Sequence, residues 1–216
     1  MWVYSPPDIP WLVELHVDRD LFVLDKPSGL LSVPGRDPAR HDSAFTRVQA
    51  RFELARMVHR LDLDTSGVLV VALRRKAERH LRAQFQDRTV VKGYVARVAG
   101  HVQADHDEVD LPLSLEPGRP RSRVDLVAGK AARTLYHVLS RDPDGTTRLA
   151  LEPLTGRSHQ LRVHLLAIGH PILGDRFYAP EAVVLAAPRL CLHAASLSLD
   201  HPYSGVRMTF EARVPF

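Results

Sequence analysis

The chain has 216 residues, of which 45% are apolar and 25% are charged, a composition typical of a folded globular protein that excludes a largely disordered chain. The single cysteine, Cys191, excludes an internal disulfide, and no apolar stretch approaches the roughly 20 residues that a membrane-spanning helix requires. The N-terminal residues do not form a basic stretch followed by an apolar segment. The sequence therefore predicts a cytoplasmic protein that is not bound to a membrane.

The net charge of +4 is modest, but the basic residues are clustered. Eight of them lie between Arg74 and Arg97 against two acidic residues, and five lie between Arg119 and Arg133 against Asp125 alone. Such clusters are typical of a protein that binds a polyanion, although a basic helix face can also be only a solvated surface.

In chain order, residues 1–11 contain three prolines and predict an extended arm that lies on the body of the protein. The stretches 12–17 and 21–25 predict a β-hairpin. The segment 26–35 is rich in Pro and Gly and predicts an ordered loop.

Two helices and a buried strand follow. Ser43 is a candidate cap for a helix that continues to about Glu53. The apolar run 68–73 predicts a buried strand. Over 75–87 the apolar residues recur at helical spacing, which leaves the basic residues of that helix on its outer face.

The remaining chain is rich in strand patterns, with Asp142-Pro143-Asp144-Gly145 as a turn between two of them. Strands are predicted at 90–98, 109–113, 131–139, 147–151, 190–199 and 206–212. The segment 114–130 predicts an exposed loop or a loose hairpin, and 155–168 predicts a capped helix that ends at Gly169.

Together these elements are eight to ten strands, mostly adjacent in sequence, and three or four helices. They predict the α+β class, with a mixed, largely antiparallel sheet flanked by helices. No linker stands out, so we expect a single domain over residues 1–216.

One polar stretch, 59–67, combines an imidazole, an arginine, two carboxylates and two hydroxyls directly before the buried strand. Such a cluster can be ordinary turn chemistry, with Gly67 in a conformation that other residues resist, or it can be a reactive loop held by a rigid element. Elsewhere, His164 and His170 have no Cys, Asp or Glu partners at ligand spacing, so we expect no metal site.

The stretch 59–67 also resembles the signature of a known protein family. His59-Arg60-Leu61-Asp62 followed by Thr65-Ser66-Gly67 resembles the HRLDxxTSG signature of the RluA family of pseudouridine synthases. The blocks 92–100 and 155–164 agree with that family in order and spacing, and the segments 26–35 and 169–178 are similar as well. The resemblance implies an isomerase that converts uridine to pseudouridine in RNA without a cofactor.

The resemblance also implies roles for three residues: Asp62 as the catalytic aspartate, Tyr94 stacking on the target base, and Arg162 pairing with Asp62. The chemistry is compatible, because an ionised carboxylate can attack the sugar or the ring, or remove a sugar proton, and these alternatives stay open. Burial would raise the pKa of the aspartate, and an arginine partner opposes that change. The tyrosine hydroxyl could also take part in the final deprotonation at carbon.

A target base inside folded RNA must be flipped out, and the resemblance places Arg60 in the vacated stack. The predicted RNA contacts are His59, Arg60, Arg75, Lys76, Arg79, Lys92, Arg119, Arg121 and Arg123, and the predicted pocket residues are Thr65, His159 and Leu161.

Many members of the family carry an N-terminal S4-like domain, which we do not expect in this chain. The chain resembles the dual-specificity member, which modifies the anticodon loop of some tRNAs and a hairpin loop of large-subunit rRNA. We therefore expect RNA as the partner and a monomer that needs no protein partner. The alternatives are a non-catalytic RNA-binding module, favoured by the basic clusters alone, and a metal-dependent hydrolase that uses the histidines.

Overall fold

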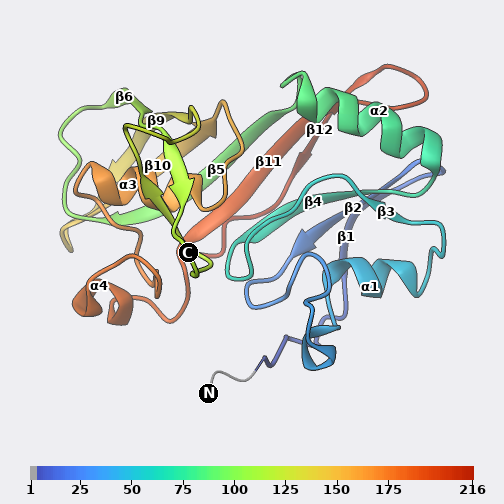
Figure 1. The fold of residues 1–216 in the computed structure, drawn as a ribbon, viewed down its shortest axis with the longest axis horizontal. Helices are drawn as coiled ribbons and strands as arrows, with labels where there is room; N and C mark the ends of the chain where they lie inside the picture. Colours follow the sequence, from blue (N-terminus) through green and yellow to red (C-terminus); the bar gives the residue numbers. More distant parts are fainter. Residues whose placement is uncertain (1–3) are drawn as a thin grey trace. The chain divides into compact units, whose positions relative to one another are not determined.

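The computed structural model describes residues 4–216, which form two compact units. Unit 1 extends up to Lys92 and resumes over Ala194–Pro215, and unit 2 comprises Gly93–His193 with Phe216. The strands are β1 Val13–Val17, β2 Leu21–Lys26, β3 Arg56–Met57, β4 Ser66–Ala72, β5 Val91–Ala99, β6 His106–Asp110, β7 Leu113–Leu115, β8 Ser122–Val124, β9 Arg133–Arg141, β10 Thr146–Pro153, β11 Leu192–Asp200 and β12 Arg207–Glu211 (Figure 1). The helices are α1 Ala44–Gln49, α2 Arg75–Gln86, α3 Gln160–Ala167 and α4 Glu181–Leu185, with a 3-10 turn at Pro38–Arg40.

Unit 1 is a sheet in the order β1-β2-β4-β11, with β3 paired to β4 and β12 paired to β11. All seven residues of β4 are buried, which explains why the apolar run of this strand is continuous and does not alternate. On one face, Ala77 and Leu81 of α2 pack against a cluster that contains Val23 of β2. Neighbouring Phe22 points to the opposite face, where its ring lies 5.6 Å from that of Phe52, just after α1.

Unit 2 is a sheet in the order β5-β10-β9-β6, in which each neighbouring pair is antiparallel. Leu161 and Leu165 of α3 pack on this sheet beside Leu149 and Leu151 of β10. The strands β7 and β8 form a separate antiparallel hairpin.

The α+β class is confirmed, as are the hairpin β1-β2, the buried strand β4 and the helix α2. Ser43 caps α1 as expected, and its side chain accepts from the Thr46 N–H. Residues 4–11 contain neither helix nor strand, as expected of an arm, and the Tyr4 hydroxyl ties them to the body by donating to the Asp42 carbonyl at 2.8 Å. Residues 1–3 of the arm lie outside the described chain. The expectation of a single domain stays a prediction.

Four expectations about elements were wrong. The helix α1 ends at Gln49 and not near Glu53, and the strand expected at 109–113 is divided between β6 and β7. The described chain contains twelve strands where eight to ten were expected, because short β3 carries no pattern of its own, 109–113 is divided between two strands, and β8 lies in the segment expected to be a loop or loose hairpin.

The fourth error concerns α3, which begins at Gln160 and not at Thr155. The Thr155 hydroxyl donates to the Gln160 side chain at 2.6 Å, so it does not cap the backbone of a helix that starts beside it. Residues 155–159 therefore form a loop that leads into α3.

Candidate active site

The loop that carries Asp62 is fixed on both sides of that residue by the segment 26–32. The Ser32 hydroxyl donates to the Leu61 carbonyl at 2.7 Å and accepts from the Leu61 N–H at 3.0 Å. Beyond Asp62, the Gly29 N–H donates to the Leu63 carbonyl at 3.0 Å. The partly buried Asp62 is thus held between two residues whose backbones are clamped.

Lys26 strengthens this clamp from inside the protein. Its side chain is fully buried, and its ammonium donates to the carbonyl oxygens of Pro27 at 2.9 Å, Leu30 at 2.7 Å and Leu63 at 3.1 Å. A buried charge costs several kcal/mol unless such acceptors replace its water. The charge therefore ties the end of β2 to the loop that carries Asp62.

Gly67 fixes the other end of that loop at the start of β4. Its φ is +113°, and a Cβ at this position would lie 2.2 Å from the Ala194 carbonyl oxygen of β11. Only glycine tolerates both conditions, as the sequence predicted for its conformation.

His59 is a structural member of the same loop. Its Nε2 accepts from the Val70 N–H at 3.0 Å, and its ring stacks on Phe85 of α2 at 4.7 Å. Burial, together with the Lys92 ammonium, lowers the pKa of His59 to about 3. The imidazole is therefore neutral at physiological pH. Neighbouring Arg60 is exposed, and no residue among 4–216 is found as an ion-pair partner for it.

In unit 2, Arg162 is held by a residue that the sequence analysis missed. Its Nε donates to Asp175 Oδ2 at 2.8 Å and its terminal nitrogen donates to Oδ1 at 2.6 Å, with both side chains buried. The guanidinium also lies 5.1 Å from the centre of the Phe177 ring and 5.2 Å from that of Tyr178. This bidentate pair fixes the plane of a permanent positive charge.

His159 and Tyr178 extend this cluster. His159 adopts a left-handed backbone with φ +53° and stacks on Phe177 at 5.7 Å. The Tyr178 hydroxyl accepts from the Ser122 N–H at 2.8 Å and forms a hydrogen bond with His159 Nδ1 at 2.7 Å. Burial raises the pKa of Tyr178, so its hydroxyl keeps its proton at physiological pH. A strained backbone held by such contacts is common at functional sites.

The predicted site residues are divided between the two units. Tyr94 lies on β5 opposite Leu151 of β10 and is partly buried. Unit 1 holds His59, Arg60, Asp62, Thr65, Arg75, Lys76, Arg79 and Lys92, and unit 2 holds Tyr94, Arg119, Arg121, Arg123, His159, Leu161 and Arg162.

The predicted RNA contacts differ in exposure. Arg75, Lys76 and Arg79 are exposed on α2, and Arg119 and Arg123 are exposed around the β7-β8 hairpin. Arg121 is partly buried, with its guanidinium 5.1 Å from the centre of the Tyr178 ring. Arg121 therefore belongs to the aromatic cluster as much as to the surface.

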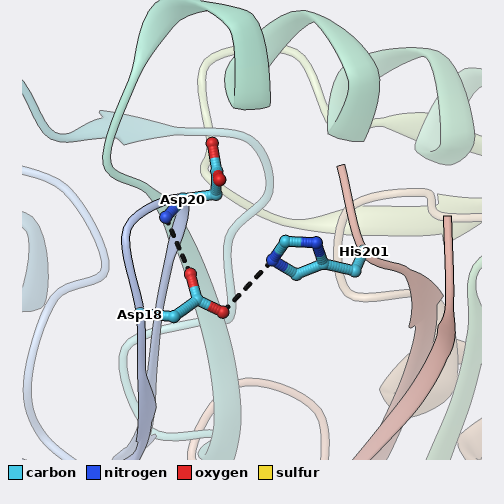
Figure 2. A group of neighbouring side chains, drawn as sticks. All are labelled: Asp18, Asp20 and His201. Carbon is cyan, nitrogen blue, oxygen red and sulfur yellow. Dashed lines mark hydrogen bonds and ion pairs between the residues drawn. The ribbon is translucent and has the colours of Figure 1, made fainter. Parts of the chain in front are cut away.

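Among residues 4–216, Asp18, Asp20 and His201 approach one another closely enough to suggest a metal site, with ligand atoms within 4.8 Å (Figure 2). Their atoms are already engaged. Asp18 accepts from the N–H groups of Asp20 and Leu21 and contacts two histidine rings, and Asp20 forms an ion pair with Arg74. We assign this cluster a structural role. His164 is likewise engaged by Thr134 and by the Leu111 carbonyl.

None of the helices found in residues 4–216 has the length and apolarity needed to cross a membrane.

Similarity to known proteins shows the family to which this chain belongs. A family model described as RNA pseudouridylate synthase matches residues 20–167. The chain belongs to the RluA family of RNA pseudouridine synthases and is an isomerase that acts on RNA.

Three relatives and one solved structure show how similar this chain is to known members of the family. The dual-specificity RNA pseudouridine synthase RluA of Salmonella typhimurium is 55% identical over 99% of this chain and 98% of its own length. Its namesakes in Escherichia coli K12 and Haemophilus influenzae are 53% and 50% identical over the same shares. The structure of human RNA pseudouridylate synthase domain containing 1 is 30% identical, with a TM-score of 0.81 over 98% of this chain and 87% of that one.

Proposed function

We propose that this enzyme modifies uridines in two kinds of structured RNA, the anticodon loop of tRNA and a hairpin loop of 23S rRNA. Relatives that are 50–55% identical over nearly the whole chain, and whose name states dual specificity, support this choice of substrates. The basic, exposed face of α2 supports an RNA partner as well. The enzyme would act as a monomer in the cytoplasm, on RNA alone.

Asp62 starts the reaction in this proposal. The observation that carries it is the clamp of Ser32 and Lys26 on the residues flanking Asp62, since a reactive carboxylate must be held to a fraction of an ångström. The bond from the sugar carbon to the ring nitrogen breaks and a bond to ring carbon 5 forms, while that carbon loses a proton and the nitrogen gains one. All atoms of the uridine are retained, so the net reaction needs no oxidant, reductant or cofactor.

Tyr94 stacks on the flipped base, and Arg162 keeps Asp62 ionised. Arg162 suits this role because its charge is permanent and Asp175 already fixes its orientation. Arg60, exposed at the start of the same loop as Asp62, fills the gap that the flipped base leaves in the RNA stack. Thr65, His159 and Leu161 line the pocket.

The test is to incubate the purified enzyme with a tRNA anticodon stem-loop and with a 23S rRNA hairpin, and to map pseudouridine chemically. We expect one modified uridine in each RNA. Maps of total RNA from cells with and without the gene should differ at the same positions. Product in only one RNA would refute the dual specificity, and no pseudouridine in either RNA or in the cell maps would refute the proposal as a whole.

A further inference from the structure

An exposed tyrosine lies on unit 1, in the turn that joins β11 to β12. The Tyr203 side chain is 75% exposed, and it forms part of the wall of a hollow of about 220 Å³. The other residues that line this hollow are Asp18, Arg19, Asp20, Arg74 and His201. A tyrosine ring exposed to this extent contributes little to the core, so its face is accessible to a partner.

The turn that carries Tyr203 is rigidly held. His201 Nδ1 accepts from the Tyr203 N–H at 3.3 Å and from the Ser204 N–H at 3.1 Å. The proton of the ring is therefore on Nε2, which donates to Asp18 at 3.2 Å (Figure 2). Through its other oxygen, Asp18 accepts from two backbone N–H groups at the β1-β2 turn. The cluster that resembles a metal site thus anchors the turn and presents the tyrosine.

Basic side chains of α2 lie beside Tyr203. The Lys76 ammonium lies 6.0 Å from the centre of the Tyr203 ring, within the range of a cation–π contact. Glu78, the acidic residue nearest to Lys76 on α2, is held by Arg56 at 3.3 Å and by Arg82 at 2.9 Å. Arg75 and Arg79 are exposed, and no carboxylate in the described chain is found paired with either of them.

We propose that Tyr203 and Lys76 form a second RNA-contact surface, in which the ring stacks on an unpaired base and the ammonium binds a backbone phosphate. This inference rests on the proposed function. Exposed aromatic rings beside basic residues are the usual means of binding single-stranded RNA. Lys76 lies nine residues before Phe85 on α2, about 14 Å along the helix, and Phe85 stacks on His59 of the loop that carries Asp62. At this distance, Tyr203 and Lys76 contact nucleotides that flank the target base, and not the target base itself.

Binding and turnover of the target stem-loop by three variants test the stacking. We expect Tyr203→Ala to raise the Kd and KM for RNA by at least about fivefold, the lower end for loss of one stacking ring, with kcat retained within about twofold. Tyr203→Phe should bind like the wild type, because it keeps the ring. Leu185→Ala, which truncates a 77% exposed side chain on α4, is the matched control and should change nothing.

The phosphate contact is tested separately by salt. Lys76→Ala should reduce the slope of log K against log salt by about 0.7 to 0.9, the contribution of one phosphate contact. If the wild type makes pseudouridine while Tyr203→Ala binds RNA within about twofold of it, this inference is refuted and the proposed function stands. If the wild type makes no pseudouridine in any RNA, the proposed function has failed instead.

Discussion

Asp175, which the sequence analysis did not single out, fixes the orientation of Arg162, a proposed catalytic residue. Both side chains are at most 3% exposed, so neither charge has water to replace a lost partner. Removing one partner of a buried ion pair typically costs about 3–5 kcal/mol, because the other charge is left uncompensated. Asp175 therefore acts as a positioning residue for the arginine.

We predict that Asp175→Asn lowers the urea unfolding free energy by a few kcal/mol and lowers kcat by at least about tenfold, with a smaller change in KM. The matched control is Glu108→Gln, which breaks a bidentate pair with Arg133 that is exposed to solvent. It should change stability and rate little. A folded Asp175→Asn enzyme with the wild-type kcat would show that the orientation of Arg162 does not depend on Asp175.

The lowered pKa of His59 makes the free energy of unfolding depend on pH. Its pKa is lowered to about 3 by burial and by Lys92, whereas in the unfolded chain it titrates near 6.5. Between these values the unfolded state binds the extra proton, so stability is fully present above about pH 6.5 and falls as the pH falls. One such group changes the unfolding free energy by about 1 kcal/mol per pH unit within this window.

The measurement is urea unfolding of the wild type and of His59→Gln from pH 7 to pH 4. Glutamine keeps an acceptor for the Val70 N–H but does not titrate. The wild type should lose stability more steeply than the variant below about pH 6. Parallel curves for the two proteins would mean that the imidazole is not held neutral.

At the scale of elements, the 26–32 segment acts as a clamp on the loop that carries Asp62. Ser32→Ala leaves both the N–H and the carbonyl of Leu61 without their partner in a buried place, which costs about 1–3 kcal/mol of stability. We expect kcat to fall by more than KM rises, because the loop loosens around the carboxylate. Ser198→Ala, which removes an exposed cross-strand hydroxyl contact with Thr209, is the control. A Ser32→Ala enzyme that is destabilised but has the wild-type kcat would disprove the clamp.

Sequence patterns predicted the elements whose cause is local. The buried run of β4 and the helical spacing of Ala77, Leu81 and Phe85 in α2 are such cases, and both were confirmed. The start of α3 was wrong because Thr155 matches a helix cap in sequence, while its hydroxyl bonds the Gln160 side chain. Sequence alone does not distinguish these two uses of a hydroxyl.

Around the candidate site, too, the sequence revealed what is local and missed the contacts between distant residues. The polar loop at 59–67 was visible because its residues are adjacent in sequence. Asp175 lies 13 positions from Arg162, and Lys26 lies 37 positions from Leu63, so only the fold reveals these pairs. The segments 26–35 and 169–178 were recognised as similar to the family, but their physical roles required the contacts.

At the scale of the whole molecule, the boundary between the two units falls inside strands. Unit 1 gives way to unit 2 within β5, after Lys92, and unit 2 gives way to unit 1 within β11, after His193. Independent domains are usually joined through exposed linkers and not through strands. We therefore predict one cooperative unfolding transition, with calorimetric and van't Hoff enthalpies that agree. Two separated transitions would contradict the prediction of a single domain.

Single-turnover conversion of the tRNA anticodon stem-loop by Asp62→Asn tests most directly whether Asp62 carries the chemistry. The substitution keeps the size of the side chain and removes the ionisable carboxylate. We predict that the variant binds the RNA with a Kd within a few-fold of the wild type and forms no detectable pseudouridine. Pseudouridine formed at the wild-type rate by Asp62→Asn would contradict the account.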